Sequence, residues 1–175
     1  MANRNTQGFG LIAAGALGST PATSGQGKYK IDAGYGTTLF HGGAVASAAG
    51  YIVDGQTTDA PILGVLNGIF YNAATTLKPT FANHYVQVTP ANSEDIDAFV
   101  FDNPTQQYVV STDAAVAQAG YLETYDMNTS AGSTTTGQSS ATLDIADTSA
   151  DAASWRLLRS AEDPENDENA AFRSV

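Results

Sequence analysis

The chain has 175 residues, 42% of them hydrophobic, which is enough for a folded core in one domain. It contains no cysteine, so disulfides, thiolate nucleophiles and zinc–sulfur sites are excluded. Acidic side chains number 18 against 7 basic ones, giving a formal net charge of -11. Because nucleic-acid binding depends largely on basic side chains, this balance argues against DNA or RNA as a direct partner. The sequence also has no apolar run long enough to predict a membrane span.

The N-terminal 27 residues are rich in Gly, Ala, Ser and Thr and lack a sustained hydrophobic period, which is typical of an extended arm. We therefore divide the chain into an arm (residues 1–27) and a body (residues 28–175). Residues 11–17 slightly resemble a signal-peptide core, but the run is short and interrupted by Gly15, so an arm is the preferred interpretation. Such a composition buries too little apolar surface to offset its ordering entropy, so we expect the arm to become ordered along a partner subunit.

Short strand-like segments alternate with turn signals through the body, which predicts an all-β fold, either a β-barrel or a compact sandwich. Asn67-Gly68 lies between two apolar runs and is typical of a hairpin turn; a glycine-containing bulge in one long strand is the alternative. We expect Asp113 to cap a helical turn over residues 114–119 and residues 128–140 to form a mobile loop. The expected strands are residues 28–32, 50–53, 62–66, 69–71, 85–88, 96–101, 107–110, 120–125, 141–145, 155–158 and 170–175.

The sequence offers little that indicates catalysis. It has no Gly-x-Ser-x-Gly elbow, and its two histidines, His41 and His84, are more typical of surface or packing positions than of a general base. The segment from Gly8 to Ala13 matches a dinucleotide fingerprint in its letters, but too few residues precede it for the strand that such a turn requires. A β-fold glycoside hydrolase stays open as a third alternative, because so many acids always offer carboxylate pairs.

The sequence gives only weak indications of a metal. Residues 162–168 are strongly acidic, but they lack the glycine and the closing glutamate of a helix–loop–helix calcium loop. A solvated acidic turn is therefore the preferred interpretation, and two distant histidines without cysteine are weak evidence for zinc. We expect no cofactor and no metal.

Aromatic side chains occur in nearly every expected strand, and we expect most of them to fill the core. Phe99 and Phe101 lie on one face of an expected strand and could instead anchor an interface. Trp155 begins one of the few dense apolar runs in the second half of the chain. We expect it in or next to the core, beside Phe99 and either Val100 or Phe101.

A series of landmarks occurs in order along most of the chain. They are Met1–Thr6 before a glycine-rich arm, Thr38–Phe40 with Gly42–Val45, Ile62–Val65 with Gly68–Tyr71, Asp95–Val100 with Asp102–Pro104, Ser133–Gly137 with Leu143-Asp144, and Asp163–Asn166. Together these landmarks resemble the small head-decoration, or capsid-cement, proteins of tailed bacteriophages. That family often continues past an Asp-Pro-x-Asn turn into a closing strand that ends in Asn-x-His; here the chain ends at Val175, so we expect the final strand to be shorter or lost.

The resemblance implies a non-catalytic structural protein of the virion, made in the bacterial host cytoplasm and located on the capsid exterior. Its β-barrel-like body would bridge neighbouring capsid subunits. The implied partners are the major capsid protein and copies of the chain itself, as a homo-oligomer, with no direct nucleic acid and no membrane. The alternative is a secreted carbohydrate-binding or adhesion module that uses exposed aromatic side chains and loop acids. Our candidate capsid-contact residues are Asn3, Asn5, Phe9, Leu11, Ile12 and Leu17.

Overall fold

The computed structural model describes residues 7–18, 25–55, 61–128, 132–146, 155–161, 164, 166–167 and 169–175. Within these ranges the regular elements are strands and two single-turn 3-10 helices, Ala91–Ser93 and Gln118–Gly120. All ladders between the strands are antiparallel. The expectation of an all-β chain is therefore confirmed. The described strands form separate open sheets, and no closed barrel is found among them.

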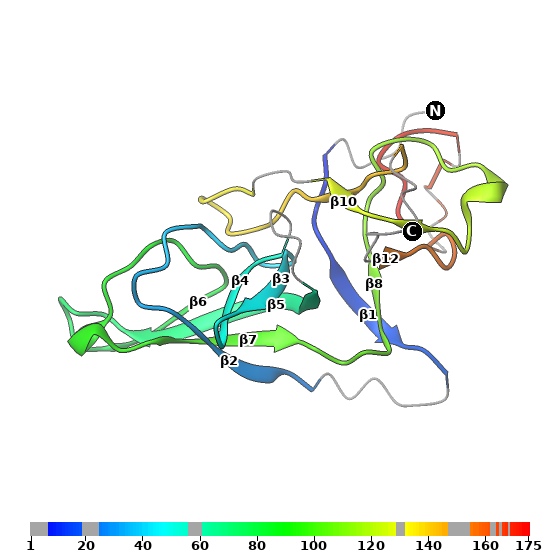
Figure 1. Cartoon of the computed structure of the whole chain (residues 1–175). Coiled ribbons are helices and arrows are strands. Elements are labelled where there is room, and N and C mark those ends of the chain that lie inside the picture. The colour runs from blue at the N-terminus through cyan, green and yellow to red at the C-terminus, as the bar shows by residue number, and fades with distance from the viewer. Residues whose placement is uncertain are drawn as a thin grey trace.

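Six strands form the largest sheet (Figure 1). The central strand β5 pairs with β7 along one edge, and with β3 and then β6 along the other. The order is β2 (Gly27–Ile31), β7 (Ile96–Phe101), β5 (Ile62–Asn72), β3 (Ala44–Ala48) and β4 (Tyr51–Asp54), with β6 (Pro79–Ala82) also paired to β5.

The sheet curls until its outer strands, β2 and β4, approach each other. Side chains rather than a strand ladder connect this region: the Tyr51 hydroxyl donates to Asp95 Oδ2 at 3.1 Å. The backbone N–H of Asp54 likewise donates to the Tyr35 hydroxyl oxygen at 2.8 Å. The curl encloses the first core cluster, whose members include Ile31, Leu66 and Ile96.

Alternation along the strands explains which side chains enter this cluster, since successive residues of a strand point to opposite faces. In β7 the side chains of Ile96, Ala98 and Val100 are fully buried, whereas those of Asp97 and Phe99 are only partly buried. We call the side that carries Asp97 and Phe99 the outer face of the sheet.

The other described strands form three two-stranded sheets beside the large one (Figure 1). Val175 closes this part of the molecule, because it exchanges backbone hydrogen bonds of 2.9 and 3.0 Å with Val110. The pairs are β1 (Ile12–Ala16) with β8 (Gln106–Val109), β10 (Met127–Asn128) with β11 (Thr142–Leu143), and β12 (Trp155–Arg156) with β9 (Thr124–Tyr125). A second core cluster fills the space between them, made of Leu11, Ala44, Val65, Val110, Val116, Tyr125, Leu143, Leu157 and Val175.

The Asn67-Gly68 pair does not form a hairpin turn. Strand β5 runs through it without a break, and its register with β7 shifts between Leu66 and Gly68. The hairpin prediction is wrong, and the alternative of a glycine-containing bulge is right. Gly68 sits opposite Phe99, so the bulge leaves a position without a side chain beside an aromatic ring.

Three local predictions also differ from the structure. Residues 85–88 form no strand; Tyr85 makes only an isolated bridge with Leu39, and its ring is buried in the first cluster. Asp113 caps no helical turn, because its carboxylate accepts the backbone N–H of Ile145 at 3.0 Å. Within residues 132–140, the N–H of His41 donates to the Gly137 carbonyl at 2.9 Å, so hydrogen bonds hold part of the expected mobile loop.

The arm residues 7–18 lie against the same chain. Strand β1 pairs with β8, and the N–H of Leu11 donates to the Gly42 carbonyl at 2.8 Å. The expectation that a partner subunit orders the whole arm is therefore not met at these residues. Residues 1–6 and 19–24 lie outside the described part of the chain, and the division at residue 27 stays a prediction.

Candidate functional site

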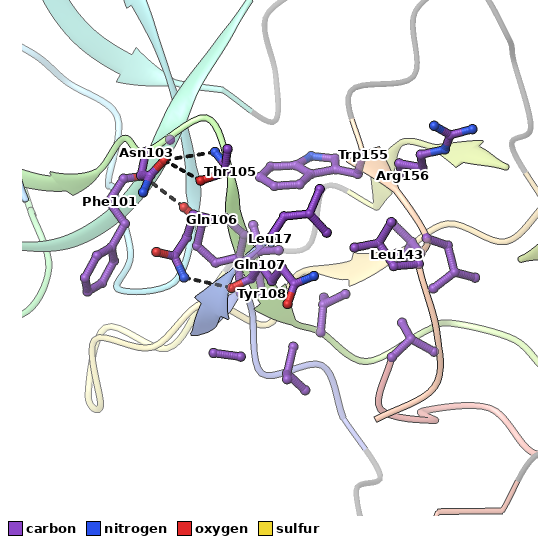
Figure 2. A pocket seen from close by; sticks show the side chains of 18 of the residues that line it. Leu17, Phe101, Asn103, Thr105, Gln106, Gln107, Tyr108, Leu143, Trp155 and Arg156 are labelled. Carbon is purple, nitrogen blue, oxygen red and sulfur yellow. Dashed lines mark hydrogen bonds between the residues drawn. The ribbon is translucent and has the colours of Figure 1, made fainter. Parts of the chain in front are cut away.

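A groove of about 680 Å³ lies where the small sheets meet one end of the six-stranded sheet (Figure 2). Its walls come from β1, the start of β5, the end of β7 with the turn that follows, β8, and the segment that begins at β12. Large apolar side chains dominate the lining. Prominent among them are Leu17, Ile62, Phe101, Tyr108, Trp155 and Leu158.

Trp155 and Tyr108 form an aromatic wall of this groove. Their ring centroids are 5.7 Å apart and their planes meet at 87°, an edge-to-face arrangement. The Tyr108 hydroxyl donates to the Phe101 carbonyl oxygen at 2.9 Å. Burial, with a smaller effect from the nearby charge of Asp102, raises the pKa of Tyr108 to about 12. Tyr108 is therefore neutral at physiological pH and supplies ring surface rather than a titrating group.

The turn between β7 and β8 supplies polar groups. Asn103 Oδ1 accepts hydrogen bonds from both the backbone N–H and the hydroxyl of Thr105, each at 2.9 Å, which stabilises the turn. Gln106 Nε2 donates to the Gly15 carbonyl at 2.6 Å and so links β8 to β1. Figure 2 shows these amide side chains together with the ring of Trp155 among the residues that line the groove.

Two of the charged groups at the groove already have partners. Asp102 Oδ2 accepts the Tyr29 hydroxyl at 2.6 Å, and this hydrogen bond raises the pKa of Tyr29. Arg156 Nε donates to the Leu122 carbonyl at 3.0 Å. The groove thus combines aromatic walls with neutral amides, an arrangement suited to binding an apolar segment or the flat face of a sugar.

The histidines act as packing and hydrogen-bonding residues. His41 Nδ1 donates to the Asn67 carbonyl at 2.9 Å, next to the bulge in β5. The ring of His84 stacks on Phe40, with centroids 6.3 Å apart and an interplanar angle of 7°. In the part of the chain that the structure describes, no three His, Asp or Glu side chains are grouped as a metal site would require. The acidic run at residues 162–168 lies mostly outside that part.

The candidate capsid-contact residues have different environments. Leu11 is 4% exposed and belongs to the second core cluster. Ile12 and Leu17 are 48% and 56% exposed, and Phe9 is half-buried. Asn3 and Asn5 lie outside the described residues. The structure therefore places Ile12 at the start of β1 and Leu17 directly after its end, with both side chains at the surface.

Trp155 lies next to the second core cluster, as expected, and shares the groove with Phe101. Phe99 does not lie beside it, because Phe99 projects from the outer face of the large sheet and packs with Phe81. Val100 points the other way, into the first cluster. The sequence pattern placed Phe99 and Val100 on one strand correctly, but it does not reveal which cluster each face of that strand contacts.

Sequence reasoning missed the amides of the groove. Gln106 and Gln107 follow Asn103-Pro104, a turn that the sequence does reveal, and polar residues after such a turn are the available signal.

No described helix is both long and apolar enough to cross a membrane. No family model matches the chain, and the searches of curated proteins and of solved structures found no match. The likeness to phage head-decoration proteins therefore depends on the sequence landmarks alone.

Proposed function

We propose that this chain is a non-catalytic virion protein that binds the outside of a phage capsid and cements neighbouring capsid subunits. The ordered landmarks described above are the reason for naming a capsid as the partner. The partners would be the major capsid protein and further copies of the chain. On this view the curled six-stranded sheet is a barrel-like body whose outer strands remain unpaired with each other.

The observation that carries the proposal is the exposure of Ile12 at the start of β1 and of Leu17 directly after its end. Ile12 begins a strand that is anchored by β8 and by Leu11, and Leu17, directly after that strand, is held by a hydrogen bond from its N–H to the Thr105 carbonyl at 2.8 Å. Exposed apolar residues on a rigid element are typical of a surface that associates with a partner. Binding to the assembled shell and not to the free subunit would stabilise the shell by mass action.

Co-sedimentation with expanded, empty capsids of the encoding phage tests this proposal. We expect saturable binding with a fixed copy number. The double variant Ile12→Asp, Leu17→Asp should bind at least tenfold more weakly, because each aspartate would have to lose water at the contact. Val86→Asp is the matched control, since Val86 is also an exposed apolar residue but lies far along the chain from β1. Equal binding by all three proteins, or none, contradicts the proposal.

Salt and chelator distinguish the type of contact. Exposed ion pairs contribute about 0–1 kcal/mol each, so we expect capsid binding to weaken only modestly from low to high salt. We also expect no effect of a chelator. Release by chelator that added calcium reverses would identify a metal-dependent adhesion module instead.

The aromatic groove favours a second candidate function, that of a carbohydrate-binding module. Trp155, Tyr108 and the amides of Gln106 and Gln107 are the types of side chain that stack on and hydrogen-bond to sugars. A glycan array with the wild-type chain tests it. Binding of a glycan that quenches the fluorescence of Trp155, together with no binding to capsids, would favour this alternative.

A further inference from the structure

Residues 173–175 lie beside the extension of β8. The N–H of Val175 donates to the Val110 carbonyl at 2.9 Å, and the N–H of Val110 donates back to the Val175 carbonyl at 3.0 Å. On the other side of this short segment, the N–H of Ala161 donates to the Ser174 carbonyl at 3.0 Å. Residues 173–175 therefore run between the extension of β8 and the end of the segment that begins at β12.

The same edge of β8 continues beyond Val175 without a strand partner. Successive residues of an extended strand direct their backbone groups to opposite edges. Val110 faces Val175, whereas the carbonyl of Thr105 faces β1, because it accepts the N–H of Leu17 at 2.8 Å. Tyr108, two residues from Val110, therefore directs its N–H and its carbonyl along the edge of Val175. Among the described strands β8 pairs with β1 alone, so no described strand pairs with these two groups.

The groove follows this open edge. Gln106, Tyr108 and Trp155 are among its lining residues (Figure 2). The whole segment of residues 155–161 also lines it, and so does Val175. The elements that flank residues 173–175 thus flank the groove as well. Its volume of about 680 Å³ lies within the range of about 300–1,000 Å³ that is typical of ligand sites. The groove is therefore a slot in which one more extended segment could pair with β8.

The register indicates which side chains such a segment needs. Residues that face each other across an antiparallel pair project to the same side of the sheet. Val110 and its partner Val175 both belong to the second core cluster, and Tyr108 packs against that cluster. A residue paired with Tyr108 would point its side chain towards the same cluster, so an apolar side chain is required there. The residues before and after it would point to the side of β8 that carries Gln107, where polar side chains are tolerated.

We propose that the groove binds an extended segment of the capsid subunit, with alternating apolar and polar residues, as an added strand on β8. Backbone hydrogen bonds to Tyr108 supply affinity, and the apolar surface beside Trp155 supplies specificity. The inference rests on the proposed function, because the capsid is the partner there. Leu17, an exposed residue of the proposed capsid contact, also lines the groove, so the two surfaces are continuous.

A second copy of the chain is a weaker choice of donor. Every strand in the described part of the chain already pairs with another strand of the same chain, so none of them is free to be donated. The formal net charge of -11 on each copy also opposes self-association at long range. The capsid subunit is therefore the donor that the experiment tests.

Overlapping capped peptides that tile the major capsid protein of the encoding phage test the inference on the isolated full chain. Trp155 is the only tryptophan and lines the groove, so its fluorescence reports binding. We expect one group of overlapping peptides to bind and to change this emission. At saturation with such a peptide, the amide hydrogen of Tyr108 should exchange with deuterated water at least tenfold more slowly. The amide of Val109, which faces β1, is the internal control and should change little.

A variant of the groove connects the peptide to the capsid. Leu158 lines the groove and is 36% exposed. Leu158→Asp should weaken binding of both the peptide and empty capsids at least tenfold, because a carboxylate there opposes burial of an apolar segment. Val86→Asp is the matched control, since Val86 is 39% exposed and does not line the groove. It should bind both partners as the wild type does.

The outcomes separate this inference from the proposed function. Binding of capsids but of no capsid peptide, or capsid binding that Leu158→Asp leaves unchanged, overturns the inference and leaves the proposed function standing. A fluorescence response of Trp155 to glycans alone also overturns it, as does a bound peptide that leaves exchange at Tyr108 unchanged. Absence of any capsid binding refutes the proposed function and this inference with it.

Discussion

Replacing Leu11 by alanine measures how far the N-terminal segment belongs to the folded body. Leu11 is 4% exposed and packs in the second core cluster, although its surroundings in the sequence are typical of an extended arm. Burying a leucine contributes about 1.5–3 kcal/mol, and the cavity that alanine leaves adds to the loss. We therefore expect Leu11→Ala to lower the free energy of unfolding by about 3 kcal/mol.

Leu17→Ala is the matched control for this substitution. Leu17 is on the same segment but 56% exposed, so roughly half of its side chain gains little from folding. The expected loss is about 1 kcal/mol or less. The comparison removes the effect of changing leucine to alanine in the unfolded chain, because both variants share it.

Urea unfolding followed by tryptophan fluorescence provides the assay. Trp155 is the only tryptophan and lies beside the second cluster, so its emission reports the region that contains Leu11. Far-ultraviolet circular dichroism reports the whole sheet content in parallel. Equal losses of under about 1 kcal/mol for both variants would refute the reasoning. Residues 7–18 would then contribute little to the body, and the interpretation as an arm ordered by a partner would be favoured.

Three further outcomes follow from the described contacts. Gly64→Ala should lower the free energy of unfolding in urea by about 1–3 kcal/mol, since a Cβ at residue 64 would overlap the backbone of β7. Gly36→Ala is the control and should be nearly neutral, because a Cβ at residue 36 meets open space. Burial raises the pKa of Asp97, but its hydrogen bonds to the two β2 lysines outweigh burial and lower the net pKa below the unfolded value. The stability that Asp97 contributes is therefore present above about pH 4 and is lost on further acidification. When the free energy of unfolding is measured against pH, Asp97→Asn should lack this loss at low pH. Because burial raises the pKa of Tyr108 to about 12, its stabilisation is complete below the unfolded value of about 10 and is lost as pH rises through 12. In an ultraviolet titration, Tyr108→Phe should lack one late ionisation that the wild-type chain shows near pH 12.

The sequence correctly predicts the strands in which apolar and polar residues clearly alternate. Residues 28–32 and 96–101 were expected as strands and correspond to β2 and β7 within one residue. The Asn67-Gly68 pair was misread because a hairpin turn and a bulge use the same residues, and the choice depends on whether β7 pairs on both sides of the glycine. Strand β1 was missed because its sequence is mostly small residues, and only its ladder with β8 specifies it.

The candidate surfaces were less predictable than the strands. Ile12 and Leu17 could be chosen from the sequence as large apolar residues in a small-residue segment, but Leu11 beside them has the same character and is buried. The groove joins residues from both ends of the chain, and no local pattern specifies such a meeting. The packing of Phe70, Phe81 and Phe99 on the outer face likewise depends on the register of β5, β6 and β7, which sequence periodicity does not determine.

Adjacent residues of β3 and of β5 enter different core clusters. In β3, Ala44 belongs to the second cluster and Val45 to the first; in β5, Val65 belongs to the second and Leu66 to the first. Where these residues lie, one core cluster covers each face of the sheet. Neither cluster can therefore unfold locally without disturbing backbone that also carries side chains of the other cluster. The amide hydrogens of these residues should be among the last to exchange with deuterated water, and the two halves should lose their structure in one cooperative event.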